Sequence, residues 1–146
     1  MAISNCIYTN NKSAAGQNGV IFKVQMGEEI NVTNCYATGN SGKSIAGIGW
    51  GSSGLMKNVS IVNNIGTAIA FQGAAYTCQN MTISGNSSPT NGGIIDGSWE
   101  GASSISIYDC TIVGNSSADG QNAMYISGGT ATIDFDNCIY VENGDK

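Results

Sequence analysis

Apolar and polar residues alternate in short segments along the whole chain, and each of these segments ends at an asparagine. The segments are SNCIYTNN (4–11), TNCYATGN (33–40), KNVSIVNN (57–64), QNMTISGN (79–86), YDCTIVGN (108–115) and DNCIYVEN (136–143). Their last residues follow one another at intervals of 22 to 29 residues. Recurrence at a bounded spacing indicates an internal repeat, which is the strongest signal in this sequence.

The aligned segments have the same chemistry at each position. One apolar column holds Cys6, Cys35, Val59, Met81, Cys110 and Cys138, and a second, two residues later, holds Tyr8, Ala37, Ile61, Ile83, Ile112 and Tyr140. A period of two residues is typical of a strand with one buried face. A third apolar column lies upstream and holds Ile3, Val32, Met56, Cys78, Ile107 and Phe135.

Two polar columns accompany the apolar ones. The first separates two apolar columns and holds Asn5, Asn34, Asn58, Asn80, Asp109 and Asn137. We expect a buried bend there, because Asn tolerates the left-handed backbone region. The second column holds the terminal residues Asn11, Asn40, Asn64, Asn86, Asn115 and Asn143. In both columns the side-chain amides are expected to form hydrogen-bonded ladders between successive repeats.

Between the segments lies a further apolar stretch, so each repeat contains three short strands. Such stretches occur at 20–22, 48–50, 69–71, 94–95 and 124–126. Three strands in a turn of 22–29 residues predict a parallel β-helix, whose equivalent strands stack roughly 4.8 Å apart. The Gly- and Ser-rich stretches 12–19, 87–93 and 97–104 are expected to be loops. Phe22, Trp50 and Phe71 are expected to form an aromatic ladder that stops at Asp96.

At this point the chain resembles a known group. The Asn-bend repeats resemble the right-handed β-helix superfamily typified by pectate lyases. Gly-Gly-Ile-Ile at 92–95, with Ile83 three residues before Asn86 and Ile112 three residues before Asn115, is similar to the repeats of polymorphic outer-membrane and adhesin-type proteins. Together with the six repeats, the resemblance implies an all-β fold, a single-stranded right-handed parallel β-helix (solenoid) of about six rungs, as one domain over residues 1–146. It says little about function, because this fold hosts lyases, hydrolases, adhesins and phage fibres.

Composition and charge narrow the classes of function. Only 10% of the residues are charged, and the formal net charge is −5. The chain contains no arginine, and its scattered lysines form no basic stripe for a nucleic acid. No run of 18 apolar residues occurs, so we expect no membrane span, and the first residues lack a signal-peptide pattern. We expect the protein to be extracellular or at the cell surface.

Candidate chemistry is sparse. The lyases and hydrolases that the resemblance suggests rely on arginine, histidine and clustered carboxylates; this sequence has no arginine or histidine, so we expect no catalysis and no cofactor. The best remaining constellation is Asp96, Trp99 and Glu100. A tryptophan between carboxylates can stack on a sugar ring, which makes these three residues a candidate carbohydrate site. The alternative is that Trp99 covers a loop while the acids face water.

The remaining reactive residues fit structural roles. Equivalent cysteines in adjacent rungs, such as Cys6 and Cys35, lie within disulfide range, but side chains in parallel strands point the same way, so free thiols are favoured. No Cys or His spacing suggests a metal site. Six Asn-x-Ser/Thr sequons occur; Asn11, Asn86 and Asn115 are the candidate glycosylation sites, since Asn58 and Asn80 belong to the bend column expected to be buried.

The two ends of the repeat array carry no recognisable cap. An open solenoid end exposes strand edges and core. We therefore expect either a segment of a longer parent chain or end-to-end self-association. The leading hypothesis is a non-catalytic extracellular structural or adhesive module, within a surface fibre or filament. The alternative is a β-helix that binds or cleaves polysaccharide. Ice binding would need a regular threonine column, and the column of Thr9, Thr38, Val62, Ser84, Val113 and Val141 is mixed.

Overall fold

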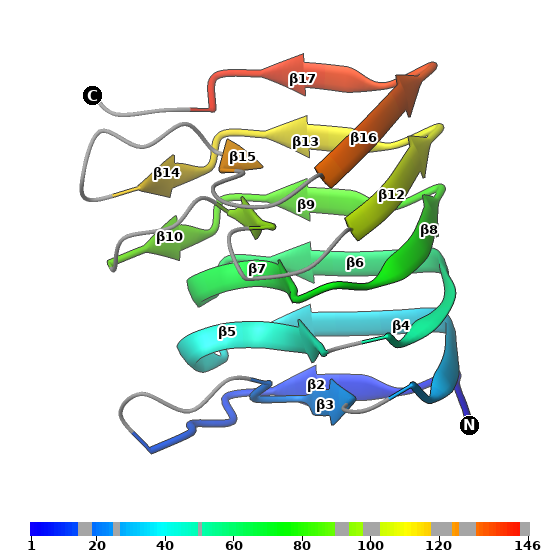
Figure 1. The fold of residues 1–146 in the computed structure, drawn as a ribbon. Helices are drawn as coiled ribbons and strands as arrows, with labels where there is room; N and C mark the ends of the chain where they lie inside the picture. Colours follow the sequence, from blue (N-terminus) through cyan, green and yellow to red (C-terminus); the bar gives the residue numbers. More distant parts are fainter. Residues whose placement is uncertain are drawn as a thin grey trace.

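The computed structural model is a parallel β-solenoid, and it describes residues 1–14, 19–24, 27–49, 51–89, 94–97, 103–117, 124–125 and 131–143. Every strand pair in these ranges is parallel. No helix occurs in the described ranges. Figure 1 shows the strands stacked in layers, with the N-terminus at the bottom and the C-terminus at the top. The expectation of an all-β solenoid is confirmed.

The strands group into six successive rungs. Rung 1 holds β1 (Ala2–Ser4), β2 (Ile7–Thr9) and β3 (Phe22–Val24), rung 2 holds β4 (Glu29–Thr38) and β5 (Ser41–Ile48), and rung 3 holds β6 (Ser53–Val62) and β7 (Ile65–Phe71). Rung 4 holds β8 (Ala75–Gln79), β9 (Thr82–Ser84), β10 (Ser87–Ser88) and β11 (Ile95–Asp96). Rung 5 holds β12 (Ser103–Tyr108), β13 (Thr111–Val113), β14 (Ser116–Ser117) and β15 (Met124–Tyr125), and rung 6 holds β16 (Ala131–Asp136) and β17 (Ile139–Val141). These strands form one sheet of ten strands and another of seven.

The number of turns is smaller than the number of repeats suggests. The six Asn-bend segments do stack, but the solenoid makes about 4 turns. Rung 6 contributes only strands β16 and β17 to the described part of the chain. The six stacked segments correspond to about 4 turns, so the expected count of about six is slightly too high.

The bend between the first two sides of each rung has the expected left-handed backbone. Its residues have φ angles between 50° and 56°: Asn5, Asn34, Asn58, Asn80, Asp109 and Asn137. Asn and Asp adopt this region more readily than other non-glycine residues because their short polar side chains bond locally. The local preference of one residue therefore sets the corner of every rung.

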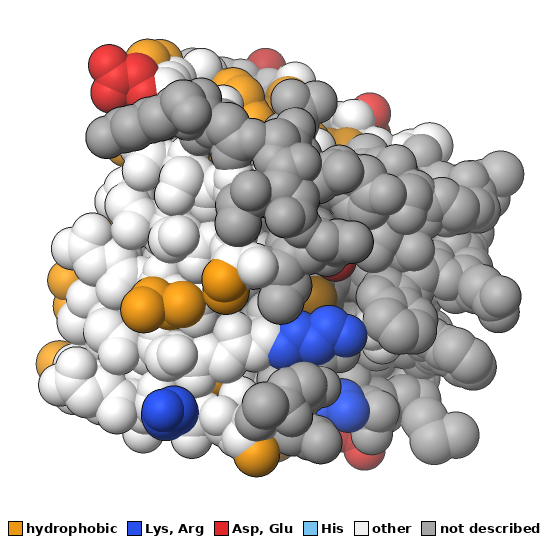
Figure 2. Space-filling model, turned by 90° about the vertical axis from the view of Figure 1, so that its left-hand side faces the viewer, with side chains coloured by type: hydrophobic (Ala, Val, Ile, Leu, Met, Phe, Trp, Pro, Cys, Tyr) orange, Lys and Arg blue, Asp and Glu red, His pale blue; other side chains and the backbone are white. Residues whose placement is uncertain are grey.

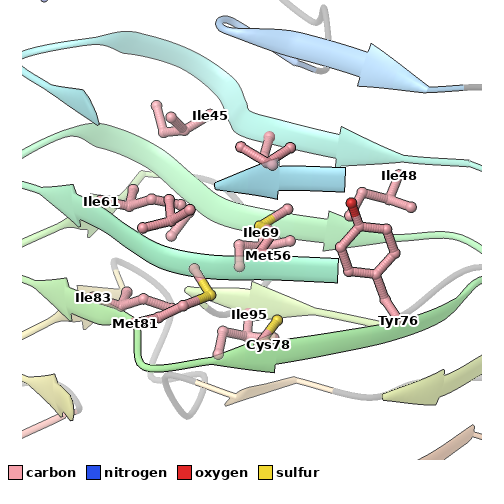
Figure 3. Close-up of a cluster of buried hydrophobic side chains, with 14 of the residues drawn as sticks. Ile45, Ile48, Met56, Ile61, Ile69, Tyr76, Cys78, Met81, Ile83 and Ile95 are labelled. Carbon is pink, nitrogen blue, oxygen red and sulfur yellow. The ribbon is translucent and has the colours of Figure 1, made fainter. Parts of the chain in front are cut away.

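The core is a stack of mostly aliphatic side chains, with some aromatic and sulfur-containing ones among them (Figure 3). Ile45, Met56, Ile61 and Ile69 are fully buried. One core position has its own geometry, because Gly54 lies between Ile30 and Tyr76 in adjacent rungs. The Tyr76 ring lies where a side chain on Gly54 would project, and its hydroxyl donates a hydrogen bond of 2.6 Å to the Ile30 carbonyl oxygen.

The expected aromatic ladder is wrong. Phe22 pairs with Ala46, whereas Phe71 pairs with Ile48, two positions further along the strand. Asp96 pairs with Ala70 and is not in the Phe71 column. Trp50 lies outside the described residues. The strands β3, β5 and β7 carry aromatic residues at more than one inward position. Two aromatic residues in successive rungs therefore need not lie in the same column.

Candidate functional site

A buried asparagine ladder runs through all six rungs at the corner after the second strand. Each side-chain nitrogen donates to the Oδ1 atom of the next asparagine: Asn11 to Asn40 (2.9 Å), Asn40 to Asn64 (3.0 Å), Asn64 to Asn86 (3.0 Å), Asn86 to Asn115 (3.0 Å) and Asn115 to Asn143 (2.7 Å). The same Oδ1 atoms accept the backbone N–H of the preceding asparagine, at 2.9 to 3.3 Å. At its four buried members, Asn40, Asn64, Asn86 and Asn115, the ladder therefore satisfies polar groups that are closed to water.

A second, exposed asparagine ladder runs along the bend and has the opposite direction. Here each side chain donates to the rung before it: Asn34 to Asn5 (3.2 Å), Asn58 to Asn34 (2.9 Å), Asn80 to Asn58 (2.8 Å) and Asn137 to Asp109 (2.6 Å). No hydrogen bond joins Asp109 to Asn80 among those found in the described ranges. An ionised carboxylate has no proton to donate, so this ladder is interrupted at Asp109.

The structure reverses the expected burial of the two ladders. The bend residues, expected near the core, are exposed, whereas Asn40, Asn64, Asn86 and Asn115 are at most 1% exposed. This corrects two glycosylation candidates. The Nδ2 atoms of Asn86 and Asn115 are the atoms that would carry a glycan, and both donate hydrogen bonds inside the folded rung. Glycosylation of the exposed Asn11 stays a prediction.

A column that the sequence comparison did not single out precedes the buried ladder. All its members have positive φ: Asn10, Gly39, Asn63, Gly85, Gly114 and Glu142. Asn63 lies against Gly85, where its Oδ1 atom takes the space that a Cβ atom would need. The signal was the Gly or Asn directly before five of the six terminal asparagines, since these residue types favour the left-handed region; Glu142 is the exception.

The five cysteines are free, as expected, and they lie in or beside the core. Burial raises the pKa of the Cys110 thiol to about 11, and it also raises the pKa of Cys35 and Cys78. Cys110 and Cys138 each donate to a nearby backbone carbonyl. A thiol that stays protonated is a poor nucleophile, so these groups have a packing role in the folded state.

The candidate carbohydrate site is described only at Asp96. This residue belongs to β11, pairs with Ala70 and Tyr125, and is 8% exposed. The expected exposed acid is therefore covered. Trp99 and Glu100 lie outside the described residues.

An uncharged face runs along the second strand of all six rungs. We call it the second-strand face; it consists of the outward residues of the strand that follows each bend: Ile7, Thr9, Tyr36, Thr38, Ser60, Val62, Thr82, Ser84, Thr111, Val113, Ile139 and Val141. Hydroxyl and aliphatic side chains occur in similar numbers. Rows are about 4.8 Å apart and the two columns about 7 Å apart, as the strand geometry requires. The face combines apolar contact area with hydrogen-bonding groups.

The C-terminal rung ends the core with exposed apolar residues. Phe135 is 42% exposed, whereas Ile107, its partner in the rung before, is 1% exposed. Tyr140 is 43% exposed, whereas its partner Ile112 is fully buried. In the described residues, β16 and β17 pair on one edge only. This end is an incomplete core and an open strand edge.

Comparisons with protein-family models, curated proteins and solved structures found no match. Among the described residues, no three His, Cys, Asp or Glu side chains are grouped as metal ligands would be. The described part of the chain also has no helix long and apolar enough to cross a membrane.

Proposed function

We propose that this protein is a non-catalytic structural and adhesive module that acts outside the cell, as a unit of a fibre or of a longer β-helix. The observation that carries the proposal is the second-strand face. It is uncharged and repeated on all six rungs, and a hydrogen-bonded ladder next to it holds its rows in place. A rigid scaffold loses little conformational freedom when it binds an extended partner.

The chemistry of the face suits a solid, uncharged surface. Its Ser and Thr hydroxyls donate and accept hydrogen bonds, and its Val and Ile side chains give apolar contact. Polysaccharide chains also present hydroxyl edges and apolar ring faces, so an insoluble neutral polysaccharide is a suitable probe. The Asn bend of every rung supports membership of the right-handed β-helix group.

The test measures retention of the chain on cellulose and on chitin particles. We expect the native chain to be retained. The double variant Thr82→Lys/Thr111→Lys should bind at least about tenfold more weakly, because binding to the particle would cover two charges that find no partner there. Ser106→Lys is the matched control, since Ser106 lies outward on β12, away from this face. Retention on neither particle, or an equal loss in the control, would contradict the adhesive proposal.

The alternative function is cleavage of polysaccharide. It is tested with a soluble acidic polysaccharide, polygalacturonate, by the release of reducing ends or of unsaturated product over time. Turnover that is proportional to protein concentration would replace the non-catalytic proposal. We expect none, because the sequence has no arginine or histidine to act on a uronate.

A further inference from the structure

We propose that the C-terminal rung of one copy binds the N-terminal rung of a second copy, head to tail, so that both asparagine ladders continue across the interface. This inference rests on the proposed structural role and adds the partner, the register and the polarity. In this register Asn143 lies over Asn11 of the next copy, and Asn137 lies over its Asn5.

The apolar columns match in this register. Phe135 and Tyr140 are the last members of two core columns, and both are more than two-fifths exposed. The first members of the same columns, Ile3 and Tyr8, are only partly buried against the core. A second copy stacked at the rung spacing would bring Ile3 against Phe135 and Tyr8 against Tyr140. Each core column then continues without a break, as it does between rungs inside the chain.

The hydrogen-bonding direction of the buried ladder permits only one order of ends. Each asparagine of this ladder donates its side-chain N–H to the rung that follows it. At the C-terminal end Asn143 therefore has a side-chain N–H directed out of the solenoid. At the N-terminal end Asn11 has its Oδ1 acceptor directed out of the solenoid. Stacking the C-terminal rung on the N-terminal rung of a second copy therefore pairs a donor with an acceptor. Two C-terminal ends would face each other donor to donor.

The exposed ladder selects the same order, although it runs the other way. Its side chains donate to the preceding rung, so Asn5 has the free donor direction and Asn137 has the acceptor that faces onward. A head-to-tail contact brings Asn5 of the second copy onto Asn137 of the first. Two ladders of opposite direction are thus satisfied by a single arrangement.

Charge also distinguishes the two ends. The stretch 1–24 contains Lys12 and Lys23 and no acidic residue, whereas the stretch 131–143 contains Asp134, Asp136 and Glu142 and no basic residue. In Figure 2 the visible lysine side chains lie in the lower half of the view, whereas acidic side chains lie near the top, near mid-height and at the lower edge. In the proposed register Glu142 lies over Asn10 of the next copy, two residues before Lys12, so the two charges lie on adjacent rungs on either side of the ladder residue. Opposite charges favour the contact, and like charges disfavour contacts between identical ends.

Such a contact is heterologous, because it uses a different surface on each copy. A heterologous contact between ends that lie on one stacking axis does not close into a dimer but continues into a filament. We therefore expect association that grows with concentration beyond two copies.

The test is sedimentation velocity of the full chain over a range of concentrations, with negative-stain microscopy of the concentrated sample. The native chain should form species larger than a dimer. Lys12→Glu and Glu142→Lys should each weaken association about threefold to tenfold, and the double variant K12E/E142K should restore it, because the pair interacts between copies. Phe135→Lys should weaken association by at least about tenfold.

Ile65→Lys is the matched control. Ile65 is 55% exposed on the side of rung 3, so this variant should associate as the native chain does. Circular dichroism and the thermal midpoint of each variant report whether it is folded. A chain that stays monomeric at every concentration, a closed dimer, or no recovery in the double variant would overturn the inference. The particle assay reports the proposed function separately, because Glu142 and Lys12 lie off the second-strand face.

Discussion

Asn64 is the residue at which the buried ladder is best tested, because it is central and 1% exposed. Its Nδ2 atom donates to the Ala37 carbonyl oxygen (3.1 Å) and to Asn86 Oδ1 (3.0 Å). Its Oδ1 atom accepts from the backbone N–H (2.9 Å) and the side chain (3.0 Å) of Asn40. The substitution Asn64→Ala removes all four of these hydrogen bonds in one step.

The cost follows from what remains buried after the substitution. The Asn40 N–H loses the acceptor that it has in the native chain, and the Ala37 carbonyl oxygen and Asn86 Oδ1 each lose a donor. A buried polar group left without its partner costs about 1–3 kcal/mol, more for a donor than for an oxygen that keeps a second bond. We expect Asn64→Ala to lower the free energy of unfolding by about 3–6 kcal/mol. That is a large part of the 5–15 kcal/mol typical of a folded domain.

The control lies on the same rung in the exposed ladder. Asn58 donates to Asn34 and accepts from Asn80, at 2.9 and 2.8 Å, but it is exposed and has a φ angle of 56°. Asn58→Gly keeps this backbone conformation, and water replaces both partners. We expect a loss of less than about 1 kcal/mol.

Chemical denaturation measures both variants, and hydrogen exchange identifies the group responsible. In Asn64→Ala the amide of Asn40 should exchange faster, relative to the global unfolding rate, than the amide of Asn86. The Asn86 amide keeps its acceptor, Asn115 Oδ1, at 3.0 Å. The reasoning is refuted if Asn64→Ala costs no more than Asn58→Gly, or if both amides change equally.

Three further predictions concern single residues. In chemical denaturation Gly54→Ala should destabilise the chain by more than about 3 kcal/mol, because the new Cβ atom would collide with the Ile30 carbonyl oxygen. Gly114→Ala is the control: its backbone also has a positive φ, but no atom lies near the new Cβ atom, so it should cost about 1 kcal/mol. Asp109→Asn should stabilise the chain by up to about 1 kcal/mol by supplying the missing donor of the exposed ladder, and a lower thermal midpoint would contradict this. Burial raises the pKa of Cys110 from 9.0 to about 11, so the unfolded state loses this proton first. The contribution of this thiol to stability is therefore constant below about pH 9 and is lost as the pH rises towards 11. In denaturation at several pH values Cys110→Val should show a shallower fall above about pH 9, and identical slopes would exclude this thiol as the cause.

The repeat itself was readable from the sequence because its signals are local. Alternation with a period of two identifies the inward column at Ile61 and Ile83, which the structure confirms as fully or nearly fully buried. The left-handed bend at Asn34 and Asn58 follows from the conformational preference of asparagine alone. Neither inference needs any knowledge of residues far away in the chain.

The sequence was less informative where two positions have the same local preference. Asn58 and Asn64 both occupy corners, and nothing in their neighbours says which corner faces water. Which of the two side chains is buried depends on how each rung closes around the core. In the structure Asn64 is buried and Asn58 is exposed. The register of the third side had the same difficulty, because Phe22 and Phe71 are both inward but at different steps of the strand.

The sequence by itself therefore determined the solenoid, its repeat and its left-handed corners, since these follow from alternation and backbone preference within a few residues. The tertiary structure decided which asparagines are buried, the opposite directions of the two ladders, and the exposure of Phe135 and Tyr140 at one end. The physical reason is that burial and hydrogen-bond direction belong to contacts between rungs. Such contacts exist only when residues 22 to 29 positions apart lie side by side.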